Sequence, residues 1–222
     1  MIDLAVWNLS IPVGSPPKTI ETPRLKAGFE GKYFNSDGGK LYFWTPVTGS
    51  TTENAKYPRT ELRETDKTGA LRNWKYGDAD SSLTANLEVT QVPSSGKIVI
   101  GQIHAYESTK PMLKLEYQYS DDRKTGKIVA KLRRTPTVSK SKVILIANDV
   151  PLNTRFNYKI HLSPKGALGI SARGESWTSK VSSKWKDRLL YFKAGVYAQD
   201  HTGYTSEGGQ VTFYKLKIKH ES

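Results

Sequence analysis

Apolar and polar residues alternate along many short runs of this chain, and clusters of Gly, Pro, Asn, Asp and Ser separate the runs. In the run SLTANLEVT, for example, the apolar members are Leu83, Ala85, Leu87 and Val89. Successive side chains of a strand point to opposite faces, so this spacing predicts a strand with one buried face. Stretches with helical periodicity are scarce, which favours an antiparallel β protein.

The run MLKLEYQYS shows the same alternation, with Leu113, Leu115, Tyr117 and Tyr119 on one face. The polar segment DDRKTGK follows it and contains Gly126, which predicts a hairpin connection to the next strand, IVAKLRR. Further strands are predicted at KLYFW, KVILIA, FNYKIHLS, LGISA and VTFYKLKIKH.

A single open sheet of so many strands would leave one whole apolar face in water. We therefore expect an all-β fold, a jelly-roll β-sandwich of two antiparallel sheets. The chain has 222 residues, 36% of them hydrophobic, which is enough for one sizeable core. Residues 1–222 are expected to form a single domain.

The balance of charge narrows the choice of partner. Lys and Arg number 34 against 21 Asp and Glu, a formal net charge of +13, which favours a polyanion such as nucleic acid, an acidic polysaccharide or an anionic membrane. The absence of cysteine excludes disulfides and Cys-based metal sites. No apolar run approaches the ~18 residues of a membrane span, so we expect a soluble chain. We also expect no membrane partner. The N-terminus has no signal-peptide pattern, but a removed one would leave no trace, and localisation stays open.

Three of the predicted strands carry unusual polar faces. The first is RTELRE, which aligns Arg59, Glu61 and Arg63 on one face. Two guanidiniums beside a carboxylate make a fork for an anion, with the acid holding both arginines in position. The plainer interpretation is a solvated charged strand.

The second is GKIVIGQIHAY. Regular alternation puts Ile98, Ile100, Gln102, His104 and Tyr106 on one face, which turns from apolar to polar at the glutamine. A histidine on a half-buried strand is more often structural than catalytic. Here, however, an amide and a phenol stand beside it on the same face.

The third is YFKAGVYAQ, in which Tyr191, Lys193, Tyr197 and Gln199 share the face opposite an apolar one. A strand facing solvent would read much the same. If the three strands are neighbours in one concave sheet, their polar faces combine into one cleft. Such a set can bind a carboxylate, neutralise it and move a proton. It lacks the carboxylate pair that glycoside hydrolysis ordinarily uses.

RTELRE, GQIHAY and YFKAGVYAQ together, in this order, resemble the three signature segments of the alginate lyases of polysaccharide lyase family 7. The ends of the chain, WNLSIPVG and GGQVTFYKLKI, are also similar to that family, so the resemblance covers essentially all 222 residues. It implies a jelly-roll sandwich with a cleft across one concave sheet. It further implies cleavage of alginate by β-elimination, with no metal or other cofactor.

The same resemblance implies roles for individual residues. Matched by position, the catalytic side chains are Arg59, Gln102, His104 and Tyr197. Further substrate contacts are expected from Arg63 and Lys193, and Glu61, Tyr191 and Gln199 lie on the same faces. Family members with Ile in the Q-x-H motif, here Ile103, are associated with substrates that contain guluronate.

These residue types suit an elimination. The proton at C5 of a uronate is difficult to remove, because charge then builds up on a carboxylate that is already negative. Arg59 and Gln102 can offset that charge, neutral His104 can accept the proton, and Tyr197 can protonate the leaving oxygen. Where C5–H and the C4 oxygen lie on the same side, Tyr197 can serve as base and acid, if nearby cations such as Lys193 lower its pKa.

Two other functions remain open. A non-catalytic module that binds acidic polysaccharide would explain the cleft but not the histidine and tyrosine beside it. Nucleic-acid binding is prompted by the charge and by KLRRTPTVSKSK, but no stacking-aromatic motif accompanies it, so we expect no nucleic-acid partner. We expect a monomer. The candidates to contribute to a positive electrostatic field at the cleft are Arg72, Lys75, Arg133 and Arg134.

Overall fold

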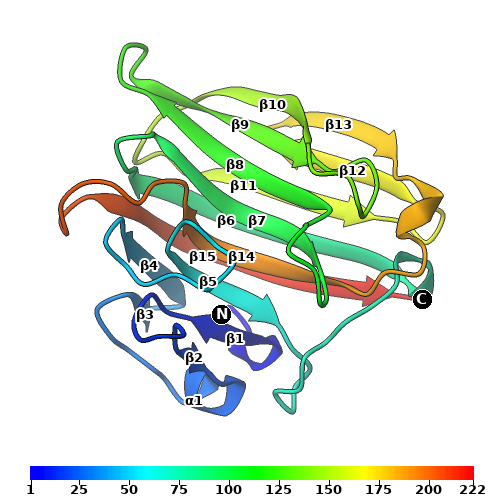
Figure 1. Cartoon of the computed structure of the whole chain (residues 1–222), viewed down its shortest axis with the longest axis horizontal. Helices are drawn as coiled ribbons and strands as arrows, with labels where there is room; N and C mark the ends of the chain where they lie inside the picture. Colours follow the sequence, from blue (N-terminus) through cyan, green and yellow to red (C-terminus); the bar gives the residue numbers. More distant parts are fainter.

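Two antiparallel sheets pack face to face in the computed structural model, which describes residues 1–222 (Figure 1). The larger has eight strands in the order β10-β9-β8-β7-β14-β5-β1-β2. Its strands are β1 (Trp7–Ser10), β2 (Thr19–Ile20), β5 (Arg59–Glu64), β7 (Lys97–Ala105), β8 (Leu113–Ser120), β9 (Thr125–Leu132), β10 (Lys142–Val150) and β14 (Leu190–Ala198).

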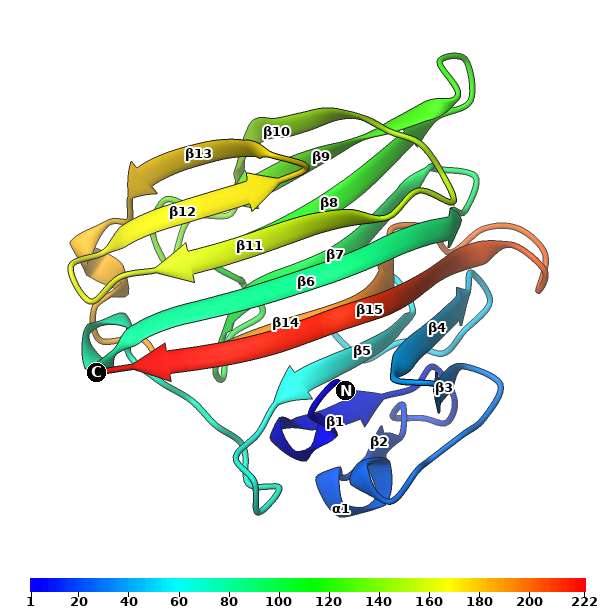
Figure 2. The same ribbon diagram turned by 180° about the vertical axis from the view of Figure 1, so that it is seen from behind.

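The second sheet has seven strands in the order β13-β12-β11-β6-β15-β4-β3, and it lies in front in Figure 2. Its two long central strands, β6 and β15, are neighbours, although β6 lies in the first half of the chain and β15 is the last strand. The strands are β3 (Phe34–Asp37), β4 (Lys40–Pro46), β6 (Asp80–Gln91), β11 (Phe156–Leu162), β12 (Ala167–Ala172), β13 (Glu175–Lys180) and β15 (Gly208–Glu221).

Helical structure is limited to short pieces at the periphery. They are α1 (Thr22–Lys26) and the 3₁₀ turns η1 (Leu4–Val6), η2 (Tyr76–Asp78) and η3 (Ser183–Trp185). The predicted all-β sandwich is therefore confirmed, and every strand proposed from alternation is present. The strand β13, ESWTSK, escaped prediction because almost all its residues are exposed, and no apolar face marks it.

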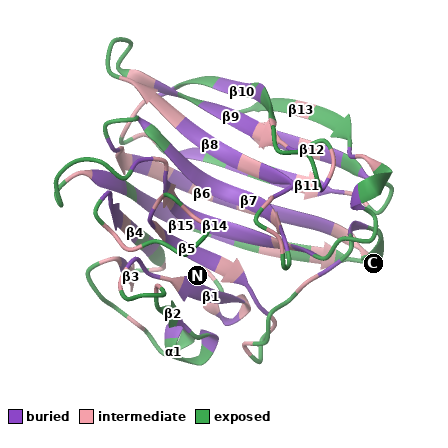
Figure 3. Cartoon of the chain, viewed as in Figure 1, coloured by how far each residue is buried: buried purple, intermediate pink, exposed green.

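The core lies between the sheets and is built from the inward faces of both. Leu83, Leu87, Leu113 and Leu115 are fully buried there, as the alternation predicts. The buried stretches follow the middle of both sheets, while the connecting loops are exposed (Figure 3). The outward face of the seven-stranded sheet is largely polar.

The strands β7, β14 and β5 lie side by side in the larger sheet, so the three polar segments found in the sequence are neighbours (Figure 1). Two bulges shape this region. The pairing of β7 with β8 shifts between Val99 and Gly101, and the pairing of β14 with β7 shifts between Ala194 and Tyr197. A bulge adds a residue to one strand, and in β7 it changes which residues face the core.

The bulge in β7 corrects one sequence prediction. Ile98 and Ile100 do not share the face of Gln102 and His104 but belong to the buried core between the sheets. The extra residue at Val99–Gly101 resets the alternation, so the strand can bury isoleucines at its start and present polar groups later. Ile103 is buried on the core side.

Candidate active site

A cavity of about 440 Å³ opens on the outward face of the eight-stranded sheet, which we call the cleft face. Its floor comes from β1, β5, β14, β7 and β8, and residues 52–55 and 108–111 contribute loop walls. Seven of the nine residues predicted from the sequence line it. They are Arg59, Glu61, Arg63, Gln102, His104, Lys193 and Tyr197.

Glu61 is the centre of this cluster. Its side chain is fully buried, and Oε1 lies 2.9 Å from Nη1 of Arg59 and 2.7 Å from Nζ of Lys193. Oε2 accepts a hydrogen bond of 2.8 Å from Nε2 of Gln102. Burial by itself would raise the pKa of this carboxyl, but Lys193 and Arg59, with hydrogen bonds from Lys193 and Gln102, lower it to about 2. Glu61 is therefore a fixed anion that holds three side chains from three strands.

The prediction that Glu61 would hold both arginines of RTELRE is wrong in part. It binds Arg59 but not Arg63, because Lys193 stands opposite Arg63 on the neighbouring strand and takes the second place at the carboxylate. The register between β14 and β5 decides this arrangement, and a single strand viewed alone does not contain it.

Lys193 is buried among cations as well as beside its carboxylate. Burial lowers the pKa of its ammonium, and Arg59 lowers it further, while Glu61 opposes both effects; the pKa is about 8. The ammonium is therefore charged at neutral pH and loses its proton in mildly alkaline solution.

His104 is neutral at the cleft. Burial, followed by the charges of Lys193 and Arg59, lowers its pKa to about 3. Nδ1 lies 2.8 Å from the backbone nitrogen of Ala105 and 3.0 Å from its carbonyl oxygen, so either neutral tautomer has a partner there. No hydrogen bond from the protein reaches Nε2, which is free to act as acceptor in one tautomer and donor in the other.

Tyr197 lies under Arg59, whose guanidinium carbon is 3.8 Å from the centre of the phenol ring. Burial raises the pKa of the phenol, and Arg59 offsets only part of that increase. The expectation that Lys193 lowers this pKa is not met, because Arg59 is the cation that opposes burial and the net shift is upward. The hydroxyl thus keeps its proton and is suited to give it away as an acid.

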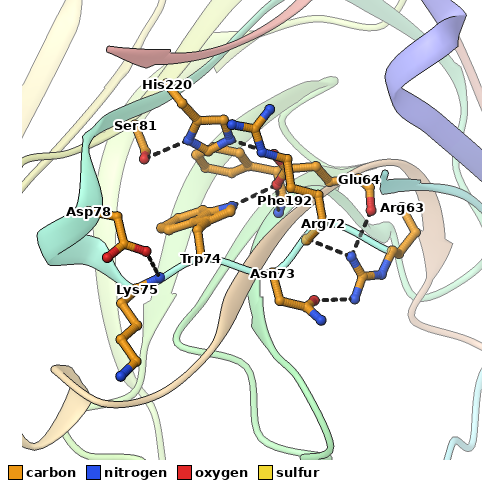
Figure 4. Close-up of polar contacts among 10 residues, drawn as sticks. All are labelled: Arg63, Glu64, Arg72, Asn73, Trp74, Lys75, Asp78, Ser81, Phe192 and His220. Carbon is orange, nitrogen blue, oxygen red and sulfur yellow. Dashed lines mark hydrogen bonds and ion pairs between the residues drawn. The ribbon is translucent and has the colours of Figure 1, made fainter. Parts of the chain in front are cut away.

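Arg63 is held by the connection between β5 and β6 (Figure 4). Nη1 donates to the carbonyl oxygens of Glu64 and Arg72 at 2.7 and 2.8 Å, and Nη2 donates to Oδ1 of Asn73 at 2.5 Å. Its guanidinium stacks 3.6 Å from the centre of the Tyr191 ring. That ring stacks on His104 at 5.3 Å and 19°. The loop therefore fixes a stack that ends at the imidazole.

A second buried carboxylate, Glu64, follows Arg63 on β5 (Figure 4). It accepts hydrogen bonds from Nε1 of Trp74 at 2.8 Å and from the backbone nitrogen of Phe192 at 2.9 Å, and Nε2 of His220 contacts its other oxygen. Ser81 is hydrogen-bonded to Nδ1 of His220 at 2.8 Å. Ser81, His220 and Glu64 therefore lie in line. Ser81 is only 1% exposed, so this network holds the two sheets together and does not present a nucleophile to a substrate.

Two predicted contacts lie outside the cavity. Gln199 follows the end of β14, and its amide nitrogen points back to the carbonyl oxygens of Tyr197 and Ala198 at 3.3 Å each. Tyr191 is not part of the lining but supports His104 from the side. Tyr106 lies just beyond β7 and does not line the cavity either.

The four basic residues proposed for the field of the cleft do not line it. Arg133 is buried and donates to the carbonyl oxygens of Pro111 and Ser139 at 3.0 and 2.9 Å, so its charge is used to tie two loops together. Lys75 faces Asp187 at 4.0 Å, and Arg72 lines a different cavity. Arg134 is likewise absent from the lining.

Sequence reasoning missed cavity residues on strands that it treated as structural. Lys114 on β8 lines the cavity, as do Asn8 on β1 and Asn54 in the loop. The alternation in MLKLEYQYS already placed Lys114 opposite the core face. What the sequence lacked was the information that β8 lies next to β7.

A larger cavity, about 810 Å³, lies against β6, β11 and β15 and contains none of the predicted site residues. No group of three or more His, Cys, Asp or Glu side chains is placed to hold a metal ion. The structure also contains no helix with the length and apolar character needed to span a membrane.

The fold and the cleft together define a β-sandwich protein that presents a cationic, carboxylate-braced cavity to a polyanion. The family model described as alginate lyase matches residues 2–220. An alginate lyase of Klebsiella pneumoniae is 27% identical over an alignment that covers 98% of this chain and 89% of the relative. The chain belongs to the alginate lyase family.

Solved structures agree with this placement. The crystal structure of an alginate lyase from Pseudomonas aeruginosa has a TM-score of 0.95 and 38% identity, and the match covers 99% of this chain and 100% of that one. Alginate lyase A1-II′, a member of polysaccharide lyase family 7, has a TM-score of 0.87 and 28% identity, with coverage of 100% and 97%. A variant of A1-II′, solved with a substrate written GGMG, has a TM-score of 0.84 and 28% identity over 99% and 94%.

Proposed function

We propose that this chain cleaves the 1→4 linkages of alginate by β-elimination, within a single catalytic domain of residues 1–222. The products carry a 4,5-unsaturated uronate at the new non-reducing end. The observation that carries the proposal is that Arg59, Gln102, His104 and Tyr197 all line one cavity, with Glu61 bound to two of them. Membership of the alginate lyase family supports the substrate.

In the proposed mechanism, Arg59 and Gln102 bind the carboxylate of the sugar whose C5–H bond breaks. Negative charge grows on that carboxylate as the proton leaves, and donors fixed in advance stabilise it without reorganising. Glu61 orients both donors, since each bonds to a different one of its oxygens. One such donor typically contributes ~3 kcal/mol, or about 10² in rate.

Neutral His104 then takes the C5 proton, the electron pair of that bond forms the C4=C5 double bond, and the C4–O4 bond breaks. Tyr197 protonates the departing oxygen. In the tautomer whose Nδ1–H donates to the carbonyl oxygen of Ala105, Nε2 of His104 is free to act as the base.

A module that only binds acidic polysaccharide is the alternative. The family match and the neutral imidazole beside a protonated phenol both favour catalysis over binding alone. The test is to incubate the chain with alginate and follow the near-ultraviolet absorbance of the unsaturated uronate. Binding without any rise in absorbance on guluronate, mannuronate or mixed blocks would favour the module instead.

The pH dependence of kcat/KM follows from the same charges. Because the pKa of His104 is about 3, its proton is absent from mildly acidic to neutral solution, and we expect no acidic limb near the ordinary histidine value of about 6.5. Because the pKa of Lys193 is about 8, the cleft loses a positive charge as the pH rises through that value, and kcat/KM should fall there. The profile is to be measured at constant ionic strength.

Lys193→Arg provides the control for the alkaline limb. Arginine stays charged over the whole range, so the limb should move to higher pH in this variant. An alkaline limb that is unchanged in Lys193→Arg, or an acidic limb near pH 6.5 in the parent chain, would contradict these assignments.

Asn73 is expected to matter through Arg63, although it does not line the cavity. Asn73→Ala removes the acceptor at 2.5 Å from Nη2, so Arg63 loosens and the stack under His104 loses its outer member. We expect kcat to fall several-fold and stability to fall by about 1–2 kcal/mol. Asn73→Asp keeps an acceptor and should retain most activity. Equal losses in both variants would show that the side chain does not act through this hydrogen bond.

A further inference from the structure

The cavity of about 810 Å³ lies on the other sheet, and the proposed reaction does not use it. It lies against β11, β6 and β15, whose outward face is turned away from the cleft face (Figure 2). Five basic side chains and one acidic one line it, whereas four basic and one acidic line the cleft cavity. The five are Lys67, Arg72, Lys159, Lys215 and Lys217. The cavity without an assigned role is therefore the more cationic of the two.

Three of these lysines stand together on the outward face of the seven-stranded sheet. Lys159 on β11 and Lys217 on β15 are both paired with Thr84, which lies between them on β6. Strands lie about 4.8 Å apart, so the two lysine backbones are roughly 10 Å apart. Lys215 comes two residues before Lys217 on β15, about 7 Å along the strand. All three side chains are exposed, so the cluster is open to a ligand from solvent.

The carboxylates of the surrounding strands are engaged by other groups. Glu88 accepts a hydrogen bond from a tyrosine hydroxyl, and Asp80 contacts a histidine ring. Glu221, at the end of β15, lies 3.6 Å from Lys219. No carboxylate oxygen lies within 4.0 Å of the ammonium of any of the three lysines of the cluster. Their charge is not paired within the protein and attracts an anion from outside.

An asparagine beside the lysines has an unused donor. Arg155 donates from Nε to Oδ1 of Asn86 at 2.8 Å, and because a guanidinium can only donate, this contact fixes the orientation of the Asn86 amide. Nδ2 of Asn86 then donates to Oδ1 of Asn157 at 2.8 Å. Asn157 lines the cavity, and its own Nδ2 has no acceptor in the protein. That amide nitrogen can therefore donate to a hydroxyl or carboxylate oxygen of a ligand.

The cavity offers no open aromatic ring. Of the aromatic residues in its lining, Trp7 and Tyr158 are buried. The ring of Tyr214 is covered, because the guanidinium carbon of Arg155 lies 3.9 Å from its centre and Nζ of Lys40 lies 5.4 Å from it. Single-stranded nucleic acids bind by stacking their bases on open aromatic rings as well as by charge. Ammonium groups with an amide donor instead suit a chain rich in carboxylates and hydroxyls, which is an acidic polysaccharide.

We propose that Lys159, Lys215, Lys217 and Asn157 form a non-catalytic binding site for a uronate polymer, on the opposite side of the molecule from the cleft. The proposal rests on the proposed function for the identity of the polymer. The hydrophobic core separates this site from the catalytic side chains, so the site takes no part in the elimination. It holds the protein on a polymer or gel while the cleft engages another stretch of chain, which raises the effective concentration of substrate at the cleft.

The test is the double substitution Lys159→Gln with Lys217→Gln, in a Tyr197→Phe background that binds without turnover. Cosedimentation with calcium alginate gel, at constant ionic strength, measures the apparent Kd. We expect the apparent Kd to rise about tenfold, because two exposed ion pairs with the polymer are lost. In the active chain, the ratio of the rate on the gel to the rate on a soluble tetrasaccharide should fall several-fold, because a tetrasaccharide in the cleft is too short to be held at both sites.

Lys184→Gln with Lys186→Gln is the matched control, since it removes the same charge from two exposed lysines that line neither cavity. This variant should keep the apparent Kd and the rate ratio of the parent chain. Equal weakening by both double variants would show that net charge acts and not a site, which would overturn the proposal. An apparent Kd unchanged by Lys159→Gln with Lys217→Gln would overturn it as well.

Single-stranded DNA is the competing polyanion in the same assay. Tighter binding of DNA than of alginate, lost in Lys159→Gln with Lys217→Gln, would overturn the assignment to a uronate polymer. Absence of cleavage by the parent chain would overturn the proposed function instead. Cosedimentation needs no turnover, so it separates that failure from a failure of the second site.

Discussion

Tyr197→Phe is expected to fold like the parent chain and to lose nearly all ability to cleave alginate. The substitution keeps the ring under Arg59 and removes only the hydroxyl that carries the proton for O4. General acid–base catalysis contributes roughly 10²–10⁴ in rate, and no second phenol stands in this place to replace it. Rates from the ultraviolet assay, with circular dichroism for the fold, measure the effect.

The control for this substitution is Tyr204→Phe, which removes a hydroxyl from an 80% exposed tyrosine outside the cleft and should leave the rate unchanged. Turnover close to the parent level by Tyr197→Phe, on every type of alginate block, would remove Tyr197 from the mechanism. The cleft would then be a binding surface with the acid still to be found.

Glu61→Gln is expected to damage stability and activity together. The amide cannot neutralise Lys193 and Arg59, so a buried ammonium and a guanidinium lose their counter-charge. Breaking a buried ion pair by removing one partner typically costs about 3–5 kcal/mol. Because Arg59 and Gln102 also lose the group that orients them, the elimination rate should fall by at least about 10².

Urea unfolding and the ultraviolet assay measure the two effects of Glu61→Gln. Glu221→Gln, at an exposed pair with Lys219, is the control and should change stability by less than about 0.5 kcal/mol. A loss under about 1 kcal/mol in Glu61→Gln would mean that Lys193 and Arg59 do not depend on this carboxylate for their burial.

The sequence was sufficient to predict which residues share one face of most individual strands. Arg59, Glu61 and Arg63 do share one face of β5, and Lys193 and Tyr197 share the corresponding face of β14, because two-residue alternation follows from strand geometry alone. Alternation failed at Ile98 and Ile100, where one inserted residue at the bulge reverses the faces.

Contacts between side chains of different strands could not be predicted from the alternation within one strand. The choice of Lys193 over Arg63 by Glu61 depends on register across two strands that are about 130 positions apart in the chain. The hydrogen bond from Arg63 to Asn73 depends on how the connection after β5 folds back. The sequence shows Lys114 as a polar residue, but its place in the lining of the cavity depends on β8 lying beside β7.

The network around Glu64 bears on how the chain matures during synthesis. Its partners include Trp74, Phe192 and His220, so the carboxylate under the cleft is complete only with the last strand, β15. The same strand joins β6 to β4 in the other sheet. Proteins emerge from the ribosome N-terminus first, so Arg59 leaves long before Tyr197 and His220. A nascent chain therefore lacks one of the two partner strands of β5 until β14 has been made, and Glu64 gains its contact with His220 only after β15 has followed.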